Sequence, residues 1–157
     1  MKFTLPRFLV MAAASMLFYT TSHAQVTHTI FLNINTTLLN DGDTDGAFSF
    51  SVSAGTVSEN INDKKNFTIF VNEGDTIEWE GNSSSGAEVQ IDEISYVNEE
   101  NSSNIFRKPK ISGRRSNGKT KVKVKVEKEK KGKSYTYNIA FSIGTSSFSI
   151  DPKIRVE

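Results

Sequence analysis

The segment that decides the fold is KVKVKVEKEKKGKSYTYNIAFSI, residues 121–143. In its first part valines at positions 122, 124 and 126 alternate with lysines, and in its second part an apolar residue occupies every odd position from 135 to 143. A repeat of two residues is the period of a β-strand with one buried face. The Lys131-Gly132-Lys133 sequence between the two runs is typical of a turn, so the segment predicts a β-hairpin.

The same period recurs along the rest of the chain. Alternating runs are found at residues 26–34, 48–52, 67–71, 77–79, 89–96 and 148–156, separated by clusters of Gly, Asn, Asp and Ser. No segment after residue 24 has the apolar spacing of an amphipathic helix over two or more turns. These features predict an all-β fold, specifically an antiparallel Greek-key β-sandwich of the cupredoxin-like or immunoglobulin-like type.

Four local features refine this prediction. A change of phase near Asp92-Glu93 predicts a β-bulge, and Pro152 predicts a bend or an edge position. One helical turn is expected around residues 58–64. The polar, basic stretch at residues 98–117 is the longest segment without strand periodicity, and irregular loops of that length are usually functional or mobile.

The first 24 residues have the pattern of a secretory signal peptide. Lys2 and Arg7 form a short basic region, an apolar run follows at residues 8–19, and Ser22-His23-Ala24 is a small-x-small cleavage site. Cleavage there leaves residues 25–157 as a single β-sandwich domain without a transmembrane segment, so we expect a periplasmic or secreted protein. The sequence has no cysteine, so packing and β-ladders must provide its stability.

Two segments carry a resemblance to a known family. The sequence VNEGDTIEW, residues 71–79, resembles the v-x-x-G-D-x-V-x-W segment of cupredoxins, and the tail at residues 135–156 is similar to the ending of small exported cupredoxin-like proteins of Gram-negative bacteria. Cupredoxins bind copper through two His, a Cys and usually a Met. After residue 24 this chain retains only His28 of such a set. The resemblance therefore implies a cupredoxin-like sandwich without copper.

The sharpest local motif is DGDTDG, residues 41–46. Asp41, Asp43 and Asp45 occupy positions 1, 3 and 5 of an EF-hand-type calcium loop, with a glycine at position 6. The match fails at position 12, where Val52 replaces the expected Glu, and the flanking segments are predicted strands. The two interpretations are a calcium site completed by a carboxylate from elsewhere in the fold and a surface turn rich in Asp and Gly.

Charge is distributed unevenly along the chain. Residues 36–100 contain fourteen Asp and Glu but two Lys, whereas residues 107–133 contain thirteen Lys and Arg but two Glu. One interpretation is a site for a polyanion such as DNA, lipopolysaccharide or a sulfated glycan. The other is that the lysines pair with the acidic segment and protect a sheet edge. The candidate polyanion-binding residues are Arg107, Lys108, Lys110, Arg114, Arg115, Lys121, Lys123 and Lys125.

Few residues are suited to catalysis. Glu78 and Glu80 share one strand face about 7 Å apart, which overlaps the carboxylate separation of inverting glycosidases, but pairing with the lysines is the preferred interpretation. His28 has no second His and no Cys to work with, so we assign it a structural role.

We therefore expect a non-catalytic exported β-sandwich that acts as a binding or extracellular structural module. Calcium is the one candidate cofactor, and a polyanion or another extracellular protein is the expected partner. A polyanion-binding module is the first alternative, and a carboxylate-dependent glycoside hydrolase is the second.

Overall fold

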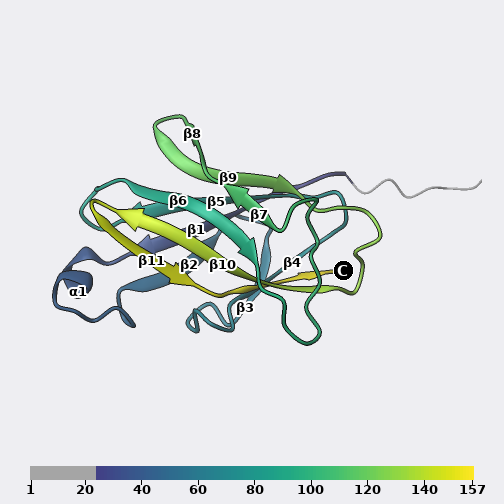
Figure 1. Cartoon of the computed structure of the whole chain (residues 1–157), viewed down its shortest axis with the longest axis horizontal. Helices are drawn as coiled ribbons and strands as arrows, with labels where there is room; N and C mark the ends of the chain where they lie inside the picture. Colours follow the sequence, from purple (N-terminus) through teal and green to yellow (C-terminus); the bar gives the residue numbers. More distant parts are fainter. Residues whose placement is uncertain (1–23) are drawn as a thin grey trace, which may run out of the picture.

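The computed structural model describes residues 24–157, which form twelve strands and one short helix. The predicted signal peptide lies outside the described residues except for Ala24. The strands are β1 (Thr27–Ile34), β2 (Phe48–Val52), β3 (Val57–Glu59), β4 (Thr68–Val71), β5 (Thr76–Ser83), β6 (Val89–Tyr96), β7 (Lys110–Ser112), β8 (Arg114–Ser116), β9 (Lys119–Lys125), β10 (Ser134–Ile143), β11 (Ser146–Ile150) and β12 (Lys153–Val156), and the helix is α1 (Thr36–Asn40). The prediction of an all-β fold is confirmed (Figure 1). In the described part of the chain, no helix has the length and apolar character needed to cross a membrane.

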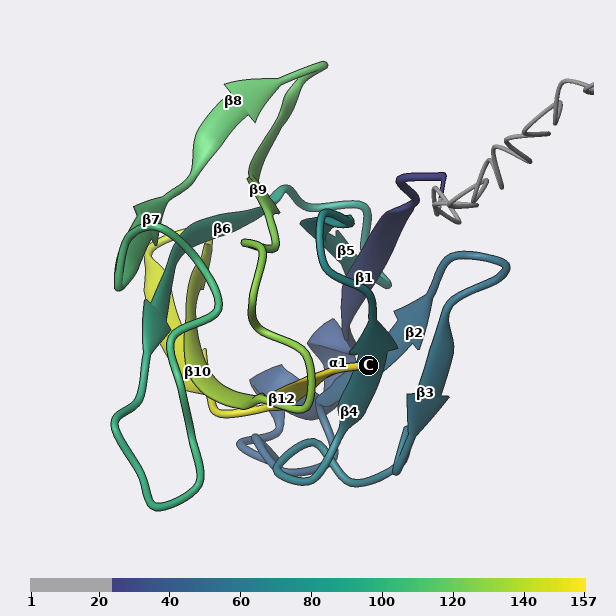
Figure 2. The same cartoon turned by 90° about the vertical axis from the view of Figure 1, so that its right-hand side faces the viewer.

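The strands form two sheets around a common interior, as the view in Figure 2 shows. One sheet has the order β2-β1-β5-β9-β8, and the other has the order β3-β4-β12-β10-β6-β7 with β11 also paired to β10. Strand β1 runs parallel to β5, and β12 runs parallel to β4. Both sheets are therefore mixed, and the expectation of purely antiparallel sheets was wrong. The two-residue period reports which face of a strand is buried, and it is the same for both directions of pairing.

The expected hairpin at residues 121–143 does not form. Its two strands exist, but β9 pairs with β5 and β8 in one sheet, while β10 pairs with β6, β11 and β12 in the other. The connection between them crosses from sheet to sheet and is held at its turn by the carboxylate of Glu73, which accepts hydrogen bonds from the backbone N–H groups of Lys130 and Lys131. The alternation of apolar and polar residues thus predicted both strands correctly, but the prediction that they pair with each other was wrong.

Two of the predicted local irregularities are found at the expected positions, the bulge near Asp92 and the bend at Pro152. The register between β6 and β10 skips Asp92, so the predicted bulge is confirmed. Pro152 lies in the bend between β11 and β12. The helical turn expected at residues 58–64 is absent, and the helix instead starts after Asn35, whose side chain caps the N–H groups of Thr37 and Leu38. The stretch at residues 98–117 contains β7 and β8, so it is only partly irregular.

The core is rich in aromatic rings at the end where β5 and β10 face each other. Trp79 packs edge-on against Phe106 and Tyr137, and Tyr137 stacks on Tyr135 with ring centroids 5.4 Å apart. The indole N–H of Trp79 donates a hydrogen bond of 3.1 Å to the Tyr137 hydroxyl. Burial raises the pKa of both tyrosines, so both hydroxyls keep their protons.

The two buried tyrosines are expected to respond in opposite ways to loss of the hydroxyl. The Tyr135 hydroxyl has no hydrogen-bond partner among residues 24–157, so Tyr135→Phe should raise the free energy of unfolding by about 1 kcal/mol. Tyr137→Phe removes the acceptor of the Trp79 N–H and should lower it by about 1–2 kcal/mol. Urea unfolding followed by tryptophan fluorescence measures both values, and a Tyr135→Phe protein less stable than the wild type would contradict the prediction.

Candidate functional site

A single glycine places two cationic segments side by side. Strand β7 pairs with β6 in one sheet, β8 pairs with β9 in the other, and Gly113 is the one residue between β7 and β8. Its N–H donates a 2.7 Å hydrogen bond to the carbonyl of Asp92 at the bulge. A Cβ atom at this position would lie 2.0 Å from the carbonyl oxygen of Ile91, so only glycine fits here. The chain therefore changes sheets at Gly113 in close contact with β6.

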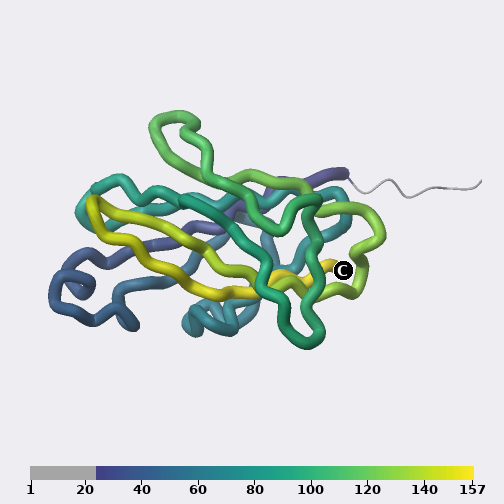
Figure 3. The backbone as a smooth tube through the Cα atoms, in the orientation of Figure 1, coloured from purple at the N-terminus to yellow at the C-terminus, as the bar shows by residue number. Residues whose placement is uncertain are grey.

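The crossing forms a groove between the β7–β8 segment and the outward face of β9. Figure 3 shows the β8–β9 hairpin extending from the body of the protein. The groove has a volume of about 740 Å³, and we call it the basic groove because five of the eight predicted polyanion-binding residues line it. These residues are Lys108, Lys110, Arg114, Lys121 and Lys123. Because they come from three different segments, folding brings them to one place from positions up to 15 apart in sequence.

The other three candidates lie elsewhere. Arg107 and Lys125 line a separate shallow hollow near residues 126–130. Arg115 is turned away from the groove and pairs with Glu88 at 2.8 Å, while also donating to the carbonyl of Gly118. The predicted set is therefore not a single site, and the groove contains its larger part.

Glu78 lies within the basic groove and neutralises part of its charge. Its carboxylate pairs with Lys121 and, at 3.3 Å, with Lys123. The neighbouring Glu80 pairs with Lys119 at 3.2 Å and with Lys121 at 3.6 Å. The predicted cross-strand pairing of these glutamates with the lysines is thus confirmed, and it follows from the antiparallel register of β5 and β9.

The electrostatics of Glu78 favour a permanent negative charge. Its burial would raise the pKa of the carboxyl, but the hydrogen bonds and charges of Lys121 and Lys123 outweigh that effect and lower it. The bond to Glu78 correspondingly raises the pKa of Lys121. A glycosidase general acid requires a raised carboxyl pKa, so the environment of Glu78 is opposite to that chemistry.

Two cations of the basic groove remain without an acidic partner. Lys108 and Arg114 are exposed and form no ion pair with any residue from 24 to 157. Lys110 lies 3.4 Å from Glu93, but its side chain is 72% exposed, so this pair contributes little. The groove therefore presents positive charge from the β7–β8 side, whereas Lys121 and Lys123 on the β9 side share their charge with Glu78.

The three aspartates of the candidate calcium loop do not converge. Asp41 ends helix α1, and the Asp43 side chain accepts a 2.8 Å hydrogen bond from the N–H of Gly46. Asp45 pairs with Lys64 at 2.8 Å, and the hydrogen bond from that ammonium lowers the pKa of the carboxyl. In the described range 24–157 no three His, Cys, Asp or Glu side chains are grouped as metal ligands. Calcium binding by this loop stays a prediction.

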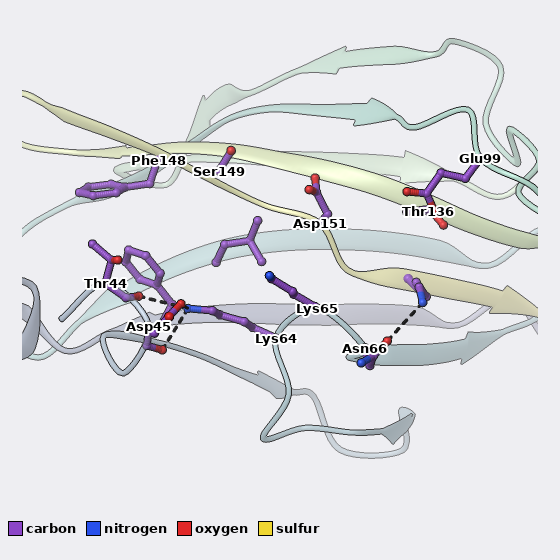
Figure 4. Close-up of a pocket in the computed structure, with 13 residues that line it drawn as sticks. Thr44, Asp45, Lys64, Lys65, Asn66, Glu99, Thr136, Phe148, Ser149 and Asp151 are labelled. Atoms are coloured by element: carbon purple, nitrogen blue, oxygen red, sulfur yellow. Dashed lines mark hydrogen bonds and ion pairs between the residues drawn. The ribbon is translucent and has the colours of Figure 1, made fainter.

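A second hollow, of about 660 Å³, lies beside this loop between β2 and β11 (Figure 4). Phe48 and Phe148 line its apolar part, with ring centroids 5.3 Å apart. Lys64 reaches back to the carbonyls of Thr44 and Asp45, and its ammonium is thereby used to hold the loop. Three lysines and three carboxylates line the hollow, so its charge favours no ligand of either sign.

His28 belongs to a buried hydrogen-bond network rather than to a groove. Its Nε2 lies 3.1 Å from the carboxylate of Asp75, and its Nδ1 lies 3.0 Å from the hydroxyl of Thr56. Asp75 is buried, which would raise its pKa, but hydrogen bonds from the N–H groups of Val26 and Asn72 and from His28 lower it. The ionised Asp75 accepts the hydrogen bond from the Nε2–H of His28. The network ties the start of β1 to the turns before β3 and β5.

The sequence alone did not identify the residues that complete the His28 network and the basic groove. The partner of His28 is 47 residues away in the chain, and only the fold brings the two together. Gly113, Ser112, Ser116 and Asn117 line the basic groove but lie in the stretch interpreted as a loop. The signal available there was a glycine flanked by polar residues within a predicted β protein, which indicates a close approach of backbones.

Comparisons with known proteins bear on the fold alone. No family model matches the chain, and no curated protein matches it. Among solved structures, the crystal structure of the inclusion body protein PixA from Burkholderia cenocepacia is similar, with a TM-score of 0.65 and 12% sequence identity. The alignment covers 87% of this chain and 98% of that chain. At this level of identity the two proteins share a fold, and nothing about activity follows.

Proposed function

We propose that the protein is a non-catalytic exported binding module and that the basic groove binds a polyanion. The observation that carries the proposal is the convergence on one groove of five basic side chains from β9, from β7 and β8, and from the loop that precedes β7. Multiple cations within reach of one chain-like ligand give affinity through release of its counterions. The signal-like residues 1–24 support export to the periplasm or beyond.

The competing interpretation assigns the lysines of β9 a purely structural role. Lys121 and Lys123 do pair with Glu78, and β8 pairs only with the beginning of β9, at residues 119–121. This interpretation accounts for β9 but not for Lys108 and Arg114, which have no acidic partner among the described residues. The proposal therefore depends on the β7–β8 side of the groove.

The proposal is tested with a double substitution on that side. Lys108→Gln/Arg114→Gln should elute from heparin at lower salt than the wild type, and the log–log dependence of affinity on salt should become shallower by up to about 2 units. The matched control is Lys128→Gln/Lys131→Gln, which removes two exposed lysines outside the groove. Equal elution of the two variants would show that overall charge, not the groove, determines binding and would overturn the proposal.

The frame that carries the groove is a separate part of the proposal. We infer a cupredoxin-like sandwich without copper from residues 71–79 and from the tail at residues 135–156. In the structure Asp75 and Trp79 of the first segment are buried, where they organise the His28 network and the aromatic core. Their structural use is compatible with a cupredoxin-like frame that holds no metal at His28.

A further inference from the structure

We propose that the ligand of the basic groove is an acidic polysaccharide rather than a nucleic acid. This inference rests on the proposed function, because it names the chemical class of the polyanion that the groove binds. It comes from three features of the groove and of the adjoining hairpin: the uncharged polar side chains in the lining, the kind of apolar surface present, and the partners of the charges at the hairpin tip.

The uncharged lining of the groove suits a ligand rich in hydroxyl groups. Ser112, Ser116 and Asn117 line it together with the cations. All three are exposed, and none of their side chains is hydrogen-bonded to another residue in the range 24–157. Serine hydroxyls and an asparagine amide donate and accept hydrogen bonds, as sugar hydroxyls do. The groove thus combines cations for acidic groups with free partners for the hydroxyls between them.

The groove lacks the surface on which bases would stack. Among the residues that the structure describes, the lining of the groove has one apolar side chain, that of Ile111, and no aromatic ring. Single-stranded nucleic acids depend on aromatic rings for a large part of their affinity. The aromatic residues nearest along the chain, Phe106 and Tyr96, pack instead against Tyr135. A polysaccharide does not require that stacking surface.

The hairpin beside the groove is not arranged to enter the major groove of duplex DNA. A two-stranded ribbon can read DNA in that way when its side chains are free to reach bases and phosphates. Here Arg115 is held by Glu88 and by the carbonyl of Gly118. Lys119 is held by Glu80 and by the side chain of Asn82, at 3.2 and 2.9 Å. The cations near the tip are thus directed back to the body of the protein.

The experiment compares ligands of equal charge. Isothermal titration calorimetry at one ionic strength would measure the affinity of the protein for three ligands: a size-defined heparin oligosaccharide, an oligothymidylate and a short DNA duplex. The three ligands are matched in their number of negative charges. The oligosaccharide should bind at least tenfold more tightly than either DNA. Ser112→Ala/Ser116→Ala should weaken oligosaccharide binding several-fold and leave DNA binding unchanged. The control is Ser146→Ala/Ser147→Ala, which changes two exposed serines of β11 outside the groove.

The outcomes separate this inference from the proposed function. DNA bound as tightly as the oligosaccharide, or no effect of the groove serines, would overturn the polysaccharide assignment while leaving a general polyanion site. Absence of binding to all three ligands at low salt would overturn the proposed function itself. Preference for the oligosaccharide that depends on Ser112 and Ser116 would support both.

Discussion

Replacing Glu78 with glutamine is expected to tighten polyanion binding and weaken the fold at the same time. The substitution removes the carboxylate that pairs with Lys121 and Lys123, so Lys123 becomes available to a ligand in the basic groove and Lys121 keeps only its 3.6 Å pair with Glu80. Affinity for heparin at low salt should rise about tenfold, and the salt dependence should steepen by up to about 2 units. The free energy of unfolding should fall by about 2 kcal/mol, because the half-buried Lys121 loses its closest partner.

The opposite signs of the two effects make this variant informative. If Lys121 and Lys123 served stability alone, loss of Glu78 would weaken the fold and leave heparin elution unchanged, and the β9 side would not belong to the site. Glu88→Gln is the matched control, since it frees Arg115 outside the groove by removing an exposed pair. We expect that control to change stability by less than about 1 kcal/mol and to leave the calorimetric affinity for the oligosaccharide unchanged. Urea unfolding and titration of the same preparations provide both measurements.

The fold shows where strand periodicity is informative. The alternation in residues 121–143 correctly identifies Val122 and Tyr137 as buried and Lys123 as exposed, because each strand has one face on the core. It does not identify partners, because β9 and β10 would show the same alternation in a hairpin or in separate sheets. The bulge at Asp92 was predictable because a bulge shifts the phase of the pattern itself.

The candidate site likewise has one part that the sequence could predict and one part that it could not. The pairing of Glu78 and Glu80 with the lysines was predictable from charge and period, since both strands present these residues on the face of the sheet away from the core. The groove was not predictable, because it depends on the chain changing sheets at Gly113. Helix α1 was missed for a local reason: it has five residues and depends on the Asn35 cap rather than on an apolar stripe.

Replacing Gly113 with alanine is expected to cause the largest loss of stability and of binding together. The added methyl group would lie 2.0 Å from the carbonyl oxygen of Ile91, so the backbone must move away from β6 and weaken the 2.7 Å hydrogen bond to Asp92. Overpacking and the weakened bond together should lower the free energy of unfolding by about 3 kcal/mol. The same movement displaces β7 and β8 relative to β9, so heparin should release the folded protein at clearly lower salt.

The control for this variant separates steric from conformational effects of glycine. Gly132 has a φ of +75°, and no atom lies within 4 Å of the place that a Cβ would take, so Gly132→Ala carries only the cost of a left-handed backbone, about 1 kcal/mol. It lies in the turn before β10 and outside the basic groove, and its elution from heparin should match the wild type. Size-exclusion chromatography isolates the monomeric folded fraction of each variant before the binding measurement. If folded Gly113→Ala protein eluted from heparin at the same salt concentration as the wild type, its affinity for heparin would have survived a displaced backbone. The sheet crossing at Gly113 would then not be what positions the cations.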